Sequence, residues 1–290
     1  MAVTRLDLRP MDLGDILDQT FRLYRAHFMT FFLIMLAVQA PVFLGQLAMQ
    51  ASLQPLYQGG RTATAGPVLQ IMGASFAYIV VAFLAVQVGI GTLTTAVSSI
   101  YLGDPIGIGE ALRRVRPILG KLLGTTMLSA VIVVLGLMAC LVPGVYFALS
   151  YLLVSEVVVI EGLGPMAALR RSSDLMRKKS DKGFLRNNIT KASVILLITF
   201  ALAFMAKMIV GVPFTIVQVM SYNPRHMPNA FAPLMLLQGI LTMIMQAGVG
   251  PIGTIAMILF YYDIRIRKEG FDLQVLAAAL GAQPVPPVQT

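Results

Sequence analysis

The sequence predicts an all-α polytopic membrane bundle of about six transmembrane helices, accompanied by amphipathic helices at the membrane interface. Of its 290 residues, 57% are apolar and only 12% are charged, and the mean hydropathy is +0.81. Soluble domains carry about 25% charged residues. The apolar residues form long continuous runs, whereas a membrane β-barrel would show short alternating segments. The Lys and Arg residues gather between these runs.

The first element is an amphipathic helix over residues 12–28 that is expected to lie along the membrane surface. Asp12 is expected to cap it, with Asp15 completing a near capping box. The apolar side holds Leu13, Leu17, Thr20, Tyr24 and Phe28, and the charged side holds Asp15, Asp18, Arg22 and Arg25. The apolar run that follows is too long for the core of a signal peptide, so we expect it to be an uncleaved anchor.

Six apolar segments are expected to cross the membrane, since about 20 apolar residues span the hydrocarbon core. They are residues 28–49, 68–98, 120–141, 145–160, 190–212 and 231–262. A tight turn is expected at Val142-Pro143-Gly144. Pro213 is expected to kink or end the fifth span, and residues 248–251 to break the sixth. All of these positions lie within a single membrane domain over residues 1–273, and the Pro-rich residues 274–290 are predicted to be disordered.

Two basic stretches lie between the spans. Residues 103–117 predict a short amphipathic helix that is capped by Asp104, with Pro105 at its first position. Residues 161–191 contain eight Lys and Arg residues and start another helix at Gly164-Pro165. Because each Lys or Arg costs roughly 2.5–3.5 kcal/mol at mid-membrane, this second stretch is expected to stay in the cytoplasm.

The distribution of the 22 Lys and Arg residues predicts the orientation of the whole chain. The segments expected in the cytoplasm hold 4, 4, 8 and 3 of them, while Arg61 and Arg225 lie on the opposite side and Lys207 lies within the fifth span. This alternation places both termini in the cytoplasm. The net charge of +9 is explained by orientation and by anionic headgroups, and the basic residues are too rarely interleaved with aromatic ones to indicate nucleic acid.

A short motif recurs along the chain. The sequence EALRR at residues 110–114 matches AALRR at residues 167–171 in four of five positions. Each copy precedes a pair of spans, as the N-terminal helix does. The pattern predicts three repeats of one amphipathic helix plus two spans, a plan that often builds a central site. The alternative is that any amphipathic helix before a span would look this way.

Five arginines are candidate contacts for lipid headgroups, because guanidinium groups bind phosphate oxygens bidentately. They are Arg113, Arg114, Arg170, Arg171 and Arg177. The alternative is that they set the topology and are only wetted by lipid. No catalytic, cofactor-binding or metal-binding motif is recognised, and the lone Cys140 is expected to be a small packing residue.

Polar residues within the spans are the second group of candidates. Glu156 is a candidate intramembrane polar site that would carry protons or bind a cation, unless it reaches the interface or pairs with a basic residue. Lys207 lies near the outer end of the fifth span, where snorkelling explains it most simply and a functional role is the alternative. The glutamines would line a polar path or, as we favour, join helices through hydrogen bonds; they are Gln39, Gln87, Gln218, Gln238 and Gln246.

Three segments resemble the membrane domain family of glycerophosphoryl diester phosphodiesterases. They are residues 9–28, the block LVPGVYFALSYLLVSEVVVIEGLGPMAALRRSSDLMR at residues 141–177, and YYDIRIRKEGFDL at residues 261–273. That family includes stand-alone bacterial forms as well as proteins in which the domain is fused to a catalytic barrel. The present sequence has no room for a barrel of about 250 residues and lacks the catalytic His/Glu set. The resemblance therefore implies a bacterial inner-membrane bundle without the enzymatic part.

These observations lead to three hypotheses. The first is a non-catalytic membrane module that associates with anionic membrane lipids, or is a scaffold for a partner protein or a second copy of itself. The second is a small-solute transporter or channel, with Glu156 and the glutamines lining a path. The third, an enzyme acting on lipid phosphodiesters, depends on the family name alone.

Overall fold

The computed structural model describes residues 10–58, 65–103, 106–177, 188–220 and 232–270. Throughout these ranges the regular structure is helical. Six segments are long and apolar enough to cross a membrane, namely Phe28–Leu53, Val68–Tyr101, Ile108–Ala139, Leu141–Glu161, Asn188–Val217 and Pro233–Glu269. The predicted all-α polytopic bundle is therefore confirmed. The expected disorder of residues 274–290 lies outside the described residues.

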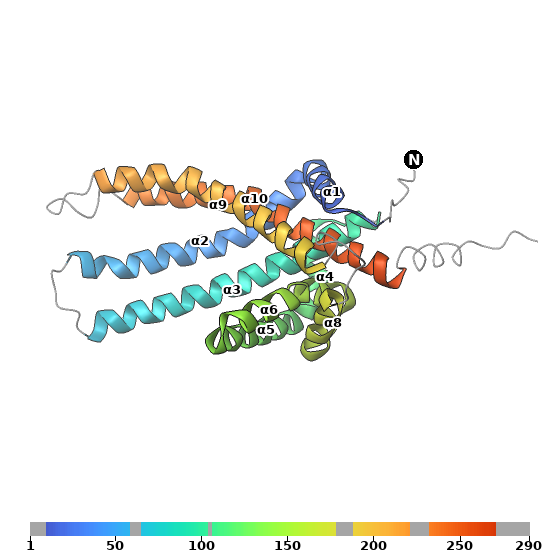
Figure 1. The fold of residues 1–290 in the computed structure, drawn as a ribbon. Coiled ribbons are helices and arrows are strands. Elements are labelled where there is room, and N and C mark those ends of the chain that lie inside the picture. Colours follow the sequence, from blue (N-terminus) through green and yellow to red (C-terminus); the bar gives the residue numbers. More distant parts are fainter. Residues whose placement is uncertain (1–9, 59–64, 104–105, 178–187, 221–231, 271–290) are drawn as a thin grey trace, which may run out of the picture.

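The helices form three hairpins. The elements are α1 (Leu13–Ala26), α2 (Phe28–Gln58), α3 (Ala65–Tyr101), α4 (Ile108–Val115), η1 (Arg116–Ile118), α5 (Leu119–Ala139), α6 (Leu141–Ser150), α7 (Val154–Glu161), α8 (Pro165–Arg177), α9 (Asn188–Met220) and α10 (Ala232–Glu269). Helix α2 packs on α3, α5 on α6, and α9 on α10 (Figure 1). A short helix, α1, α4 or α8, comes before each hairpin, which is the order the recurring motif predicts.

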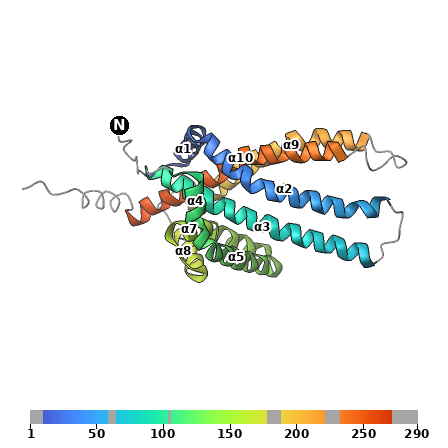
Figure 2. The same cartoon turned by 180° about the vertical axis from the view of Figure 1, so that it is seen from behind.

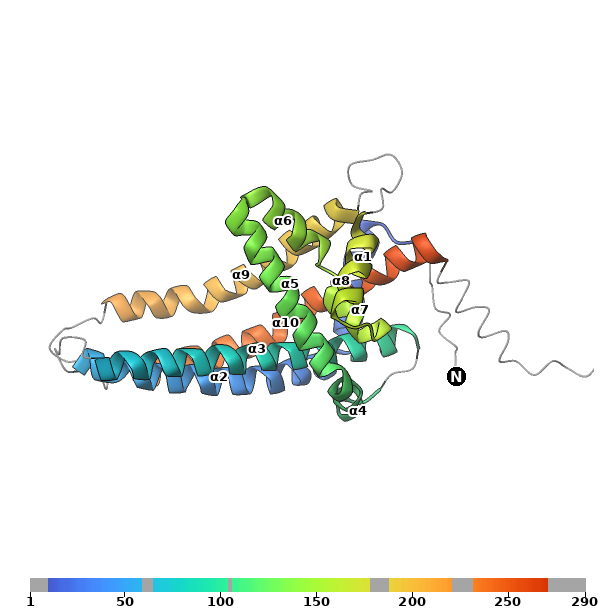
Figure 3. The same cartoon turned by 90° about the horizontal axis from the view of Figure 1, so that it is seen from below.

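The hairpins differ in reach. Helices α2, α3, α9 and α10 extend to the same end of the bundle, while the α5–α6 hairpin stops well short of it (Figure 1 and Figure 3). At the opposite end lie α1, α4, α7, α8 and the last turns of α10 (Figure 2). Helix α10 connects the parts, because it packs on α9, α2, α1, α3 and α7. The short amphipathic helices are thus gathered at one end.

The tightly packed core also lies at that end. Phe31, Leu93 and Tyr261, from α2, α3 and α10, are completely buried. Towards the opposite end the helices present large apolar side chains outward, for example Phe76 and Ile209. Such a surface is unfavourable in water and suits contact with lipid tails. The distribution of burial therefore agrees with a membrane-spanning bundle.

Helix α1 has the predicted amphipathic character. Asp12 is its N-cap, and the Asp12 backbone N–H donates to the Asp15 carboxylate at 3.1 Å. Arg22 and Arg25 are exposed. The buried stripe differs slightly from the expected one, because Ile16 rather than Leu17 is completely buried. The second short helix starts at Ile108 after a Gly107 N-cap, so the predicted cap at Asp104, which lies outside the described residues with Pro105, is wrong.

The α5–α6 turn is one place where the structure corrects the sequence analysis. The chain turns at Cys140, whose backbone is extended, while Pro143 and Gly144 lie in the first turn of α6. A Cβ on Gly144 would lie 2.4 Å from the Leu137 side chain. Glycine is therefore needed here for close helix packing, and the expected turn at Val142-Pro143-Gly144 is wrong. Cys140 is exposed rather than packed inside.

The fourth span is not one helix. Helix α6 ends at Ser150 and α7 starts at Val154. The interruption frees backbone groups that need new partners. The Ser172 hydroxyl of α8 donates to the Ser150 carbonyl at 2.9 Å, and both residues are buried. The break between α6 and α7 is thus accompanied by a hydrogen bond from α8 to the last residue of α6.

Neither Pro213 nor Pro251 ends its helix. Helix α9 continues through Pro213 to Met220, and α10 continues through Pro251 to Glu269. A proline inside a membrane helix is tolerated where neighbouring groups satisfy the freed carbonyls. Near Pro251, the Tyr24 hydroxyl of α1 donates to the Gly248 carbonyl at 2.5 Å. This bond fastens α1 to α10 one residue beyond Ala247, whose carbonyl is the one that Pro251 leaves without a helical donor.

Candidate functional site

Helix α8 carries three of the five arginines predicted to contact lipid. Pro165 occupies its first position, which suits a residue without a backbone N–H. Its buried face holds Ala168, Leu169, Ser172, Leu175 and Met176. Arg170, Asp174 and Arg177 are exposed on the other side. One face of α8 is therefore packed against the bundle, and the opposite, charged face points outward.

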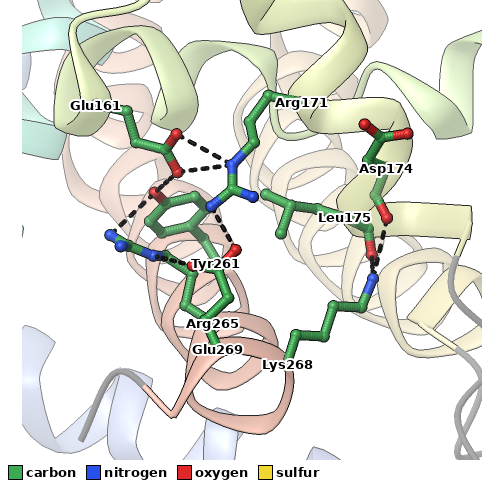
Figure 4. A network of polar contacts seen from close by, with 8 residues as sticks. All are labelled: Glu161, Arg171, Asp174, Leu175, Tyr261, Arg265, Lys268 and Glu269. Atoms are coloured by element: carbon green, nitrogen blue, oxygen red, sulfur yellow. Dashed lines mark hydrogen bonds and ion pairs between the residues drawn. The ribbon is translucent and has the colours of Figure 1, made fainter. Parts of the chain in front are cut away.

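Arg171 belongs to an internal ion network between α7, α8 and α10 (Figure 4). Its guanidinium lies 3.0 Å from the Glu161 carboxylate and 2.5 Å from the Glu269 carboxylate. The Tyr261 hydroxyl donates to Glu161 at 2.7 Å, and Arg265 lies 3.1 Å from Glu269. Burial acts to lower the pKa of Arg171, but its bonds to Glu269 and Glu161 outweigh burial and raise this pKa. Arg171 thus stays charged and has partners within the protein.

Arg113 and Arg114 also have a partner in the chain. Both lie on α4, and Glu110 accepts from each of them, at 2.5 Å and 3.0 Å. These are exposed i,i+3 and i,i+4 pairs, which are screened by solvent and contribute little to stability. The two arginines therefore remain accessible to other anions, and they do not line the two cavities beside α8 described below.

Arg170 and Arg177 line a surface cavity of about 370 Å³ between α8 and the α5–α6 hairpin. Its remaining lining residues are Ile132, Tyr151, Met166, Leu169, Ser173 and Asp174. Arg170 has no ion-pair or hydrogen-bond partner among the described residues. Arg177 donates to the Tyr146 hydroxyl at 2.7 Å, and its guanidinium lies 5.7 Å from the centre of that ring. Tyr146 thereby holds Arg177 at the edge of the cavity.

The cavity combines charge with an apolar wall. Two guanidinium groups and the Asp174 carboxylate leave one net positive charge, which matches a single phosphodiester. Ile132, Met166 and Leu169 supply apolar surface beside these charges. Such an arrangement can bind a phosphate group with hydrocarbon attached, while Asp174 can accept a hydrogen bond from a hydroxyl or ammonium group on the same ligand.

A second cavity, of about 410 Å³, lies where α8 faces the end of α10. It is lined by Arg171, Asp174, Leu175, Arg177, Lys268 and Glu269. Most of its charges have partners within the protein. Lys268 donates to the Asp174 carbonyl at 3.0 Å and also to the Leu175 carbonyl. This cavity therefore has less free capacity for a ligand than the one beside Arg170.

The intramembrane candidates lie apart from α8. Glu156 is on α7 and is only 5% exposed, and one of its carboxylate oxygens has no hydrogen-bond partner within the described part of the chain. Gln39 donates to Gln246 at 3.1 Å, which confirms the predicted role as an interhelical hydrogen bond for this pair. Gln87 is buried, with its carbonyl oxygen unpartnered among the described residues. The side chain of Gln218 lies outside what the structure describes.

The sequence analysis missed a buried ion cluster that joins the chain start to α9 and α10. Asp263 is 1% exposed and accepts from the Met11 backbone N–H at 2.8 Å. Lys191 Nζ lies 3.3 Å from Asp263 and 3.1 Å from the Met11 carbonyl, and Arg267 lies 2.8 Å from Asp263. Lys191, the last residue of the basic stretch 161–191, is only 4% exposed. A signal in the sequence was the position of Asp263 at the end of a long apolar run, just before Arg265 and Arg267.

Comparison with known proteins supports a membrane location. No protein-family model matches the chain. Over 85 residues the chain is 29% identical to the UPF0259 membrane protein SG1383 of Sodalis glossinidius (strain morsitans), and the alignment covers 29% of this chain and 34% of that protein. The chain thus matches about a third of the length of this relative. No solved structure matches. Together with the six apolar helices, this similarity indicates a multi-pass membrane protein.

Proposed function

We propose that this protein is a non-catalytic module of the bacterial inner membrane that binds phospholipid headgroups at the cavity between α8 and the α5–α6 hairpin. Both termini and α8 face the cytoplasm, as the excess of Lys and Arg at that end favours. The observation that carries the proposal is Arg170, an exposed guanidinium without a partner among the described residues. It lines the same cavity as Arg177, beside an apolar wall.

The position of α8 suits this role. Helix α8 packs on α5, α6, α7 and α9 at the end of the bundle that also holds α1 and α4 (Figure 1). A phosphodiester bound by Arg170 and Arg177 would place its acyl chains alongside Ile132 and Met166. The headgroup would extend towards Asp174, which favours headgroups with a hydroxyl or ammonium group.

The expected contribution of the two arginines can be worked out. Basic residues near an anionic membrane surface contribute about 1 kcal/mol each, and two would contribute about 2 kcal/mol. That free energy corresponds to roughly a 30-fold difference in lipid affinity. It is large enough to decide whether a lipid survives gentle extraction.

Native mass spectrometry of protein extracted from its own membrane tests the proposal. Wild-type protein should retain phospholipid in a fixed ratio, and Arg170→Gln/Arg177→Gln should lose it. Arg22→Gln/Arg25→Gln is the matched control, because it removes two exposed charges from α1 and should leave the lipid bound. Equal retention by all three proteins would contradict the proposal. Equal loss from both variants would show bulk electrostatic attraction instead of a site.

A further inference from the structure

A third cavity lies within the membrane-spanning part of the bundle, lined by α2, α9 and α10 and open at the bundle surface. Its volume is about 210 Å³. It is lined by Met35, Gln39, Ala203, Ala206, Lys207, Val210, Thr242, Met245, Gln246, Val249 and Gly250. Most of this lining is apolar, and the exceptions are one ammonium group, two amides and one hydroxyl.

The polar groups of this cavity belong to residues within the membrane-spanning segments. Gln39 is near the middle of the segment Phe28–Leu53. Lys207 lies within Asn188–Val217, about 15 Å from its C-terminal end at 1.5 Å per residue. The whole segment is about 45 Å long, so with a hydrocarbon core of ~30 Å centred on it, Lys207 lies roughly 7–8 Å inside the core. A charge at this depth is costly, so intramembrane charges mark ligand or ion sites by default.

Lys207 is exposed on the bundle surface and has no counter-charge among the described residues. No described residue forms an ion pair or hydrogen bond with its ammonium group. The lining of the cavity contains no Asp or Glu among the described residues. Gln39 and Gln246 face one another at 3.1 Å. This bond uses one amide N–H and one carbonyl oxygen, so the Gln39 carbonyl and the Gln246 amide N–H groups are left for a ligand. The cavity therefore offers one positive charge with neutral donors and acceptors nearby.

We propose that this cavity binds a small organic anion, a carboxylate with an apolar body. The carboxylate would lie against Lys207 and the Gln246 amide, and the body would contact Ala203, Ala206 and Val210. A cavity of about 150 Å³ holds benzene, so the present volume admits a molecule the size of benzoate. This site is separate from α8 and does not depend on the proposed headgroup site.

The test uses full-length protein in lipid nanodiscs, with butyrate and benzoate as probes in calorimetric titrations. Wild type should bind at least one of these acids, and Lys207→Met should weaken binding about tenfold or more, because a hydrogen bond to a charged group is lost. Lys207→Arg should retain binding and Gln246→Leu should weaken it. Arg116→Met, which removes an exposed charge elsewhere, should bind as wild type does.

Three results would overturn the inference. The first is that neither acid binds to wild type. The second is that Lys207→Met binds as tightly as wild type, in which case the lysine only reaches towards the interface. The third is that neutral benzyl alcohol binds as tightly as benzoate, which would show an apolar cavity without preference for an anion. Phospholipid retention should be unchanged in Lys207→Met, so failure here is distinguishable from failure of the headgroup proposal.

Discussion

The buried cluster around Asp263 should control the stability of the whole protein. Replacing Asp263 with Ala removes the acceptor of the Met11 N–H and leaves Lys191, 4% exposed, without its carboxylate. Removing one partner of a buried ion pair costs about 3–5 kcal/mol, because the remaining charge is uncompensated. Arg267 still donates to the Met11 carbonyl at 2.8 Å and retains part of the connection. We therefore expect Asp263→Ala to destabilise the protein by about 3–4 kcal/mol.

The double variant Asp263→Leu/Lys191→Met separates charge from packing. Because a buried ion pair replaced by apolar residues is often neutral in stability, the double variant should recover most of the loss. Glu110→Ala is the matched control, since the pairs of Glu110 with Arg113 and Arg114 are exposed and their loss should leave stability close to that of wild type. The assay is unfolding in mixed micelles with increasing denaturing detergent. If Asp263→Ala falls within about 1 kcal/mol of wild type, the reasoning from burial and pairing is refuted.

Three further predictions concern α5, α6 and α7. Gly144→Val should destabilise the hairpin by about 1–3 kcal/mol, because Leu137 occupies the space, and a melting temperature equal to that of wild type would contradict this. Glu156→Gln should leave thermal stability unchanged or raised, because a buried carboxylate oxygen without a partner is costly; a large loss would reveal a partner for the ionised acid. Cys140→Leu should leave the melting temperature near that of wild type, since Cys140 is exposed and the larger side chain can point outward, and a large loss of stability would show that Cys140 is packed.

The elements that the sequence predicts well are those that local composition determines. Six spans follow from six long apolar runs, and the amphipathic character of α1 follows from a period of 3.6 residues. The break between α6 and α7 could not be predicted in this way. It depends on Ser172 bonding to Ser150, and continuity at Pro251 is accompanied by a bond from Tyr24 to Gly248. Such contacts join residues that are far apart in the chain.

In the candidate site, too, some features follow from local sequence and others from contacts between distant residues. The sequence predicts that arginines gather at one end of the bundle, but it does not distinguish Arg170 from its neighbour Arg171. Successive residues on a helix point about 100° apart, so Arg171 turns towards Glu161 and Glu269 while Arg170 faces outward. Glu269 is almost 100 residues from Arg171, and no local pattern indicates that pairing. The distinction between a structural and an available arginine therefore requires the structure.

Photocrosslinking in native membranes tests the headgroup site most directly. Met166 is 64% exposed and lines the same cavity as Arg170 and Arg177, so a photoreactive benzophenone amino acid in its place samples that cavity. We predict a phospholipid adduct that is lost in Arg170→Gln/Arg177→Gln and retained in Arg22→Gln/Arg25→Gln. An adduct with a second protein chain, or a lipid adduct that both variants leave unchanged, would contradict the proposed site.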